Sequence, residues 1–94
     1  MVVVKVFGNL KAIFGTSELE IDVCYEDKTV NSVLNVLMKQ FGESLRRELL
    51  DSTGKIKAVY SILVNGRNIA LMSGLNTRLE ENDTVSILPL VEGG

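Results

Sequence analysis

The residues with the clearest chemical potential stand at the end of the sequence, in residues 88–94 (LPLVEGG). Gly93 and Gly94 lack a Cβ atom, so they can lie extended in a narrow channel, and a carboxylate on Gly94 is almost unhindered. Two glycines at a chain end are often only frayed polypeptide. Here they follow an expected strand without a linker. We therefore expect Gly94 to be the reacting residue, with Gly93 beside it, in chemistry performed by a partner.

Other side chains of catalytic type are few. The sequence has no histidine, which is the commonest general base and the commonest metal ligand. Cys24 is the only cysteine, so we interpret it as a small hydrophobic side chain and not as a nucleophile. Glu80, Glu81 and Asp83 fit a solvated turn better than a calcium loop, which needs ligands over a longer span. We therefore expect no metal site, and a carrier or binding module instead of an enzyme.

Length and charge narrow the class of protein further. The 94 residues make one domain, because a second hydrophobic core would have no room. Ten basic and twelve acidic side chains give a net charge of −2, which argues against nucleic acid as a partner. No apolar run is long enough to span a bilayer, and the first residues do not resemble a secretion signal. We expect a cytoplasmic protein that does not bind membranes.

Two strands are expected near the start of the sequence. Residues 1–7 are rich in β-branched side chains and are followed by a Gly-Asn pair, which is typical of a strand and its turn. Residues 17–23 alternate strictly between acidic and apolar side chains, as in a half-buried strand. The connection between them is short. These two strands are therefore expected to form an antiparallel hairpin.

The period of the apolar residues then changes from two to that of a helix. In residues 30–41 the apolar side chains recur every three or four positions and form one stripe. Thr29 is a good N-cap, and Gly42 suits the position just beyond a helix C-terminus. Leucines at helical spacing in residues 43–51 predict a second, short helix.

The last part of the sequence predicts three more strands. Asn65 and Gly66 separate two apolar runs and tolerate the positive φ angles of a two-residue hairpin turn. A final strand is expected from residue 84 to about 90, with Pro89 where the ladder ends because proline has no amide hydrogen. The order is β-β-α-β-β-β. It predicts one α+β domain over residues 1–94, with one main helix and an extra short helix on a mixed sheet, and a flexible tail from about residue 89.

One face of this sheet is expected to carry apolar side chains that the helix does not cover. Alternation places Val3, Phe7, Leu63 and Leu88 on the side opposite the core. A contiguous apolar patch of this kind marks a protein-binding surface. One alternative is an error of one residue in the register, which would turn every side chain over, and the other is a loop that covers this face.

Three stretches carry a resemblance to a known family: VKVFGNLKAIFG, VNGRNI and GLNTRLEENDTVSILPLVEGG, which includes the terminal Gly-Gly. With them, nearly the whole chain resembles the ubiquitin-like sulfur carriers of the β-grasp fold. It is most similar to the small subunit of molybdopterin synthase (MoaD type) and its archaeal relatives, which overlap with archaeal ubiquitin-like small modifiers. The long linker over residues 43–58 resembles the archaeal branch.

The resemblance implies a sulfur carrier for synthesis of the molybdenum or tungsten cofactor. An adenylating enzyme related to the ubiquitin activators would use ATP to adenylate the Gly94 carboxylate, and a sulfur donor would displace AMP to leave a thiocarboxylate. The tail would then enter the large subunit of molybdopterin synthase, which supplies the catalytic side chains. On this interpretation the chain itself binds no cofactor and is not an enzyme.

The residues expected to meet these partners are Phe7, Leu63 and Leu88 of the apolar face, together with Pro89, Leu90, Val91 and Glu92 of the tail. Two of them depart from the family pattern, because Leu90 stands where many relatives have a second proline and Glu92 where a small residue is usual. A second hypothesis is a protein modifier, in which the same adenylated glycine acylates lysine side chains of target proteins. A β-grasp interaction domain with an inert tail and a thiamine sulfur carrier are the remaining alternatives.

Overall fold

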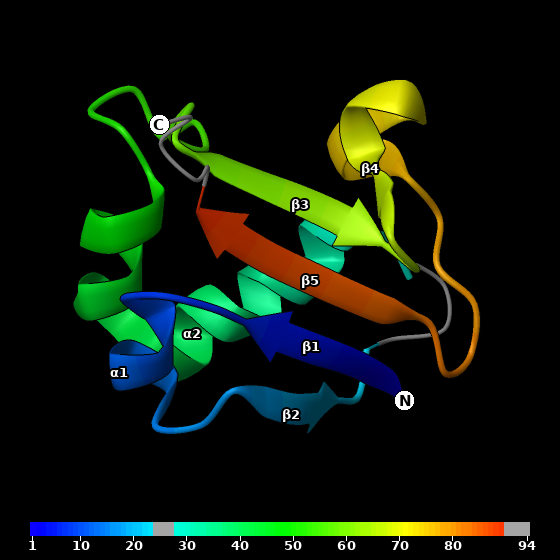
Figure 1. Cartoon of the computed structure of the whole chain (residues 1–94), viewed down its shortest axis with the longest axis horizontal. Coiled ribbons are helices and arrows are strands. Elements are labelled where there is room, and N and C mark those ends of the chain that lie inside the picture. Colours follow the sequence, from blue (N-terminus) through cyan, green and yellow to red (C-terminus); the bar gives the residue numbers. More distant parts are fainter. Residues whose placement is uncertain (24–27, 90–94) are drawn as a thin grey trace.

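The computed structural model describes residues 1–23 and 28–89 (Figure 1). It contains a mixed five-stranded sheet in the order β2-β1-β5-β3-β4, with helix α2 across one face. The predicted α+β fold with a main helix on a mixed sheet is confirmed. The elements are β1 (Val2–Val6), α1 (Leu10–Phe14), β2 (Glu18–Ile21), α2 (Val30–Leu49), β3 (Tyr60–Val64), β4 (Arg67–Asn68), the 3₁₀ turns η2 (Ile69–Leu71) and η3 (Gly74–Asn76), and β5 (Thr84–Pro89).

Strand β1 lies inside the sheet, antiparallel to β2 and parallel to β5. Its β-branched side chains suit this place, because both of its edges are paired and one of its faces is packed on the core. Val2, Val4 and Val6 are completely buried, whereas Lys5 is exposed and Val3 is half-buried. The predicted alternation and the predicted hairpin of β1 with β2 are therefore confirmed.

Helix α1 differs from the prediction, which has only a short connection between β1 and β2. Leu10 and Phe14 are spaced four residues apart and are both buried against the core. The ring of Phe14 stacks on Phe41 of α2, with 4.4 Å between the ring centroids. A helix of five residues has little intrinsic stability, so this burial is what stabilises it.

Helix α2 begins at a capping box. The Thr29 hydroxyl accepts from the Ser32 amide at 3.2 Å, and the Ser32 hydroxyl accepts from the Thr29 amide at 2.8 Å. At Gly42 the backbone is non-helical, with φ 67° and ψ −143°, so the element consists of two helical halves joined at a break. The two helices expected on either side of Gly42 correspond to these halves.

Strand β4 is short because the chain turns away after two residues. Asn65 and Gly66 form the predicted hairpin turn and have φ angles of 51° and 86°. After Arg67 and Asn68, the Asn68 side chain accepts from the Ala70 amide at 2.8 Å and starts η2. This local hydrogen bond competes with further strand pairing.

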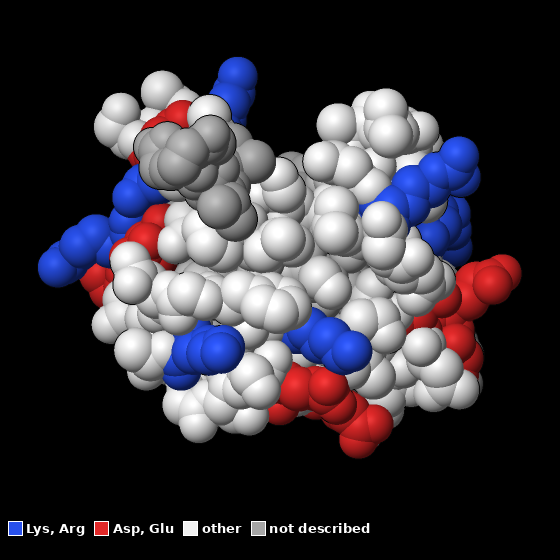
Figure 2. Space-filling model, in the orientation of Figure 1, with Lys and Arg blue, Asp and Glu red and all other residues white. Residues whose placement is uncertain are grey.

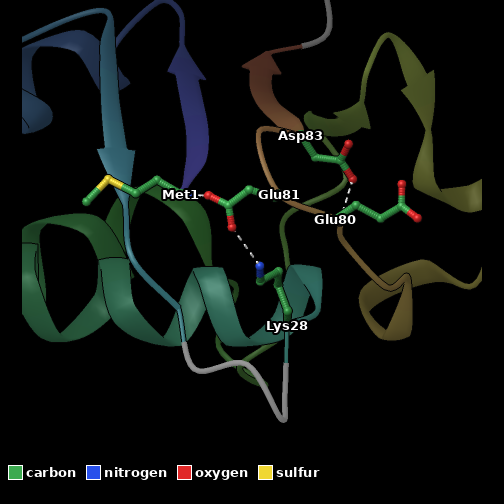
Figure 3. Close-up of polar contacts among 5 residues, drawn as sticks. All are labelled: Met1, Lys28, Glu80, Glu81 and Asp83. Atoms are coloured by element: carbon green, nitrogen blue, oxygen red, sulfur yellow. Dashed lines mark hydrogen bonds and ion pairs between the residues drawn. The ribbon is translucent and has the colours of Figure 1, made fainter.

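The turn before β5 is held by carboxylates at the end of the sheet where β1 begins (Figure 3). The Glu81 carboxylate pairs with the terminal ammonium of Met1 and, at 3.2 Å, with the Lys28 ammonium. Asp83 accepts from the Glu80 amide at 2.8 Å. The carboxylates at positions 80, 81 and 83 thus lie in a turn, as the sequence predicts. Among residues 1–23 and 28–89, no helix has the length and apolar character needed to cross a membrane.

Candidate functional site

The predicted reacting end lies partly beyond the described residues. Leu90, Val91, Glu92, Gly93 and Gly94 lie outside them, as does Cys24. The structure does describe the base from which this segment leaves the domain, at the end of β5. That base, formed by Leu88 and Pro89 with the residues around them, is called the tail base below.

Pro89 is the last residue of β5 and pairs with Tyr60, the first residue of β3. The neighbouring pair is Leu88 with Ser61. Proline contributes no amide hydrogen to a ladder, so it is tolerated at this terminal position, where the sequence places it. In Figure 1 the end of β5 points to the corner of the molecule where β3 starts. The tail base therefore belongs to a paired strand end.

Gly8 closes the tail base from the side of β1. A Cβ atom on Gly8 would lie only 3.1 Å from Pro89 Cγ, closer than side chains normally pack. The φ angle of Gly8 is +64°, which residues with a Cβ atom seldom adopt. In the sequence, Gly8 indicates only the end of a strand. A glycine directly after a strand was the available signal, but the contact with Pro89 depends on the parallel register of β1 and β5.

Tyr60 connects the tail base to the second half of α2. Its hydroxyl donates to Glu48 Oε2 at 2.5 Å, and its ring is buried. Burial, and secondly the hydrogen bond and negative charge of Glu48, raise the pKa of Tyr60 to about 12. The phenol thus remains a neutral donor in neutral solution. Sequence reasoning missed this pair, because nothing in the residue spacing shows that Tyr60 lies beside Pro89.

The predicted apolar face exists, but small hydroxyl side chains interrupt it. Leu63 lies opposite Ser86 and Leu88 lies opposite Ser61, so apolar and polar side chains alternate across the strands. Leu63 and Leu88 are half-buried, as is Val3, whereas Phe7 is 43% exposed. Figure 2 views the sheet from the side opposite α2 and shows an uncharged area over β3 and β5, with basic side chains below it. One basic side chain belongs to this face, because Lys5 of β1 is exposed and alternates with the buried Val4 and Val6. The structure therefore brings Leu63 and Leu88 together diagonally on a face that also carries Lys5, which lies opposite Ser86 on the neighbouring strand β1.

The described residues include no group of three or more His, Cys, Asp or Glu side chains arranged to hold a metal ion. The described geometry combines a braced strand end with a sheet face that is apolar over β3 and β5 and carries Lys5 on β1. Such an arrangement can present a chain end and dock a partner surface.

Comparisons with known proteins agree over nearly the whole chain. The sequence matches the ThiS family over residues 4–94. It is 39% identical over 85 residues to a protein of Archaeoglobus fulgidus named "Putative sulfur carrier protein", and the match covers 90% of this chain and 93% of that protein.

Two solved structures are also similar. The solution structure of small archaeal modifier protein 1 from Methanosarcina acetivorans has a TM-score of 0.83 and 32% identity, and the match covers 99% of this chain and 95% of that one. A Pyrococcus furiosus structure described as "Putative molybdopterin converting factor, subunit 1" has a TM-score of 0.74 and 26% identity, and the match covers 96% of this chain and 97% of that one.

Proposed function

Because the chain belongs to the ThiS family of ubiquitin-like sulfur carriers, we propose that it delivers sulfur for molybdopterin synthesis from a thiocarboxylate on Gly94. The main support is the family match through residue 94, together with 39% identity to a protein named as a sulfur carrier. Similarity to the Pyrococcus furiosus protein described as a molybdopterin converting factor subunit favours molybdopterin as the destination of the sulfur.

The chemistry that suits Gly94 is acyl activation followed by sulfur transfer. A carboxylate oxygen attacks the α-phosphorus of ATP, pyrophosphate leaves, and an acyl adenylate forms. Sulfide from a donor then attacks the carbonyl carbon, AMP leaves, and a thiocarboxylate remains. In this proposal the ATP site belongs to an adenylating enzyme and the transfer site to the large subunit of molybdopterin synthase. This chain carries the sulfur without catalysing either step.

The tail base supports this role by fixing where the reacting end starts. Five residues follow Pro89 in the sequence, and an extended chain of that length reaches at most about 17 Å. The adenylating and sulfur-accepting sites must therefore lie within that reach of Pro89. The pairing of Pro89 with Tyr60 and the lack of room for a Cβ atom between Gly8 and Pro89 support a fixed starting point for the reacting end.

The test is to produce the full chain together with its adenylating enzyme and sulfur donor and to measure its intact mass. The expected product has one oxygen of the terminal carboxylate replaced by sulfur, and it restores molybdopterin formation by the large synthase subunit. A variant without Gly94 is expected to do neither. Cofactor synthesis that continues without Gly94 would rule the proposal out.

A second candidate function is that of a protein modifier. It is favoured by the 32% identity and TM-score of 0.83 to small archaeal modifier protein 1. In this role the Gly94 acyl group would transfer to lysine side chains of other proteins, instead of accepting sulfur. Peptide mapping of host proteins is expected to show Gly94 joined to lysine ε-amines, and an absence of such conjugates under growth and stress would refute it.

A further inference from the structure

A groove of about 880 Å³ lies beside β3, along the strand edge opposite the one that pairs with β5. Helix α2, the loop before β3 and the η2–η3 segment line it. Much of this lining is apolar and includes Leu34, Met38, Ile56, Ile69 and Leu75. In the orientation of Figure 1 this edge of β3 lies at the top, and the outline of the molecule in Figure 2 is indented there.

The edge of β3 that borders the groove lacks a strand neighbour. β4 pairs only with Leu63 and Val64, and among the described strands none lies opposite Tyr60–Ile62 on that side. The space is open because the chain leaves the sheet at Asn68, whose side chain starts η2. An unpaired strand edge beside an apolar groove is a template for an additional strand.

Two backbone groups of β3 point into this space. The Asn65 amide donates to Thr84, so the odd-numbered residues of this strand direct their backbone groups toward β5. Backbone groups alternate along an antiparallel strand, and Val64 pairs with Arg67 across the two-residue turn. The amide of Ile62 and the carbonyl of Tyr60 therefore face the groove. They form one donor and one acceptor on either side of Ser61.

The charge of the groove selects the kind of segment that fits. Four basic side chains line it, and none of its described lining residues is acidic, although the whole chain has a net charge of −2. These basic residues are Lys39, Arg46, Lys55 and Lys57. Lys39 and Lys55 are exposed. The groove is thus complementary to carboxylates that flank an apolar segment.

We propose that this groove binds an extended acidic peptide segment of a partner protein, which adds to the sheet as a short strand beside β3. One peptide residue lies opposite Ser61, its carbonyl accepts from the Ile62 amide, and its amide donates to the Tyr60 carbonyl. The side chains of the two adjoining peptide residues point to the helix side of the sheet, toward Leu34 and Met38. The segment therefore has apolar residues on both sides of a central residue, with carboxylates flanking them.

The test uses the full chain labelled with ¹⁵N and a capped synthetic peptide, Glu-Ile-Thr-Ile-Glu-Glu, followed by NMR titration to millimolar peptide. The Ile62 amide signal is expected to shift and its hydrogen exchange to slow, while Val3 and Ser86 on the outer face of the sheet remain unchanged. A peptide methylated on the threonine nitrogen is expected to bind about tenfold more weakly, because the hydrogen bond to Tyr60 is lost.

A matched pair of charge reversals tests the electrostatic part. The double variant Lys39→Glu, Lys55→Glu is expected to weaken binding by about fivefold or more, since the peptide loses two attractive pairs and gains repulsion. Lys5→Glu, Lys11→Glu carries the same change in charge on exposed residues away from the groove and is expected to bind normally.

Three results would overturn the proposal. The first is an Ile62 amide that stays unaffected at saturating peptide. The second is equal binding of the methylated peptide, which would show a simple apolar pocket without strand pairing. The third is equal binding of a peptide with lysine in place of each glutamate, which would show that the basic side chains of the groove do not favour acidic peptides.

Discussion

The substitution Gly8→Ala tests whether the tail base matters to the proposed function. It places a Cβ atom 3.1 Å from Pro89 Cγ, at a residue whose φ angle is +64°. Either the backbone of Gly8 or the ring of Pro89 must then move by a few tenths of an ångström. Because Pro89 is the last residue of β5, such a movement displaces the end of the strand.

The expected loss of stability has two parts. Holding alanine in a left-handed conformation costs about 1–2 kcal/mol. The tight contact with Pro89 is expected to add about 1 kcal/mol, as overpacking typically does. For a domain of this size, a total of about 2–3 kcal/mol lowers the melting temperature by roughly 10–20 °C.

Gly15→Ala is the matched control. Gly15 has a φ angle of +76°, and a Cβ atom there would have no neighbour within 4 Å. Urea denaturation of both variants separates the cost of the backbone conformation, which they share, from the cost of the Pro89 contact, which only Gly8→Ala carries. Adding Pro89→Ala to Gly8→Ala removes Cγ and is expected to restore about 1 kcal/mol.

Thiocarboxylation of Gly94 by the adenylating enzyme and sulfur donor is the functional measurement. At a temperature where both variants are folded, Gly8→Ala is expected to be thiocarboxylated more slowly than Gly15→Ala. If Gly8→Ala and Gly15→Ala lost equal stability, or were thiocarboxylated at equal rates, the proposed steric requirement for glycine beside Pro89 would be refuted.

Two further predictions concern stability alone. Tyr60→Phe removes the donor to Glu48 and is expected to cost about 1–2 kcal/mol at neutral pH, measured by urea denaturation. The folded-state pKa of Tyr60, about 12, exceeds the ordinary value of 10, so this phenol stabilises the fold fully below pH 10 and loses its contribution as the pH rises from 10 through 12. Between pH 10 and pH 12 the free energy of unfolding of the wild-type protein should therefore fall by up to about 1.4 kcal/mol per pH unit relative to that of Tyr60→Phe. If the two free energies changed in parallel with pH, the raised pKa of Tyr60 would be refuted. Thr29→Ala removes half of the capping box and should cost about 1 kcal/mol, whereas an unchanged urea midpoint would show that the box is not stabilising.

Local patterns predicted most of the strands and the main helix, because each depends on residues that are close in sequence. The alternation in β1 and β2 requires only that one face be buried. Asn65 and Gly66 define their turn by their own φ angles, and Thr29 caps α2 through a residue three positions away. Each of these signals involves residues only a few positions apart, so it can be recognised in the sequence without knowledge of the tertiary structure.

The features that were missed depend on contacts between distant parts of the chain. Helix α1 is stable because Phe14 stacks on Phe41 of another helix. Tyr60 and Gly8 brace Pro89 only because β5 lies between β1 and β3. The chemistry expected of Gly94 comes from its residue type and from the family resemblance, and it stays a prediction. The sequence could not indicate what holds the base of the tail, which depends on the order of strands in the sheet.

In the proposed function, a partner that binds residues 90–94 in an extended channel must fix their backbone, and the sheet face can offset that cost. Fixing five backbone residues costs about 5–10 kcal/mol, and apolar surface buried from the sheet face offsets part of it at about 25 cal/mol per Å². We therefore expect Phe7→Ala to weaken binding to the adenylating enzyme or the large synthase subunit by at least about tenfold. Its effect on stability should be small, because Phe7 is 43% exposed. Leu71→Ala, at a residue that is 77% exposed in η2, is the control and should bind normally. Equal affinities of the two variants in a calorimetric titration would show that the face carrying Phe7 does not offset the cost of ordering the tail.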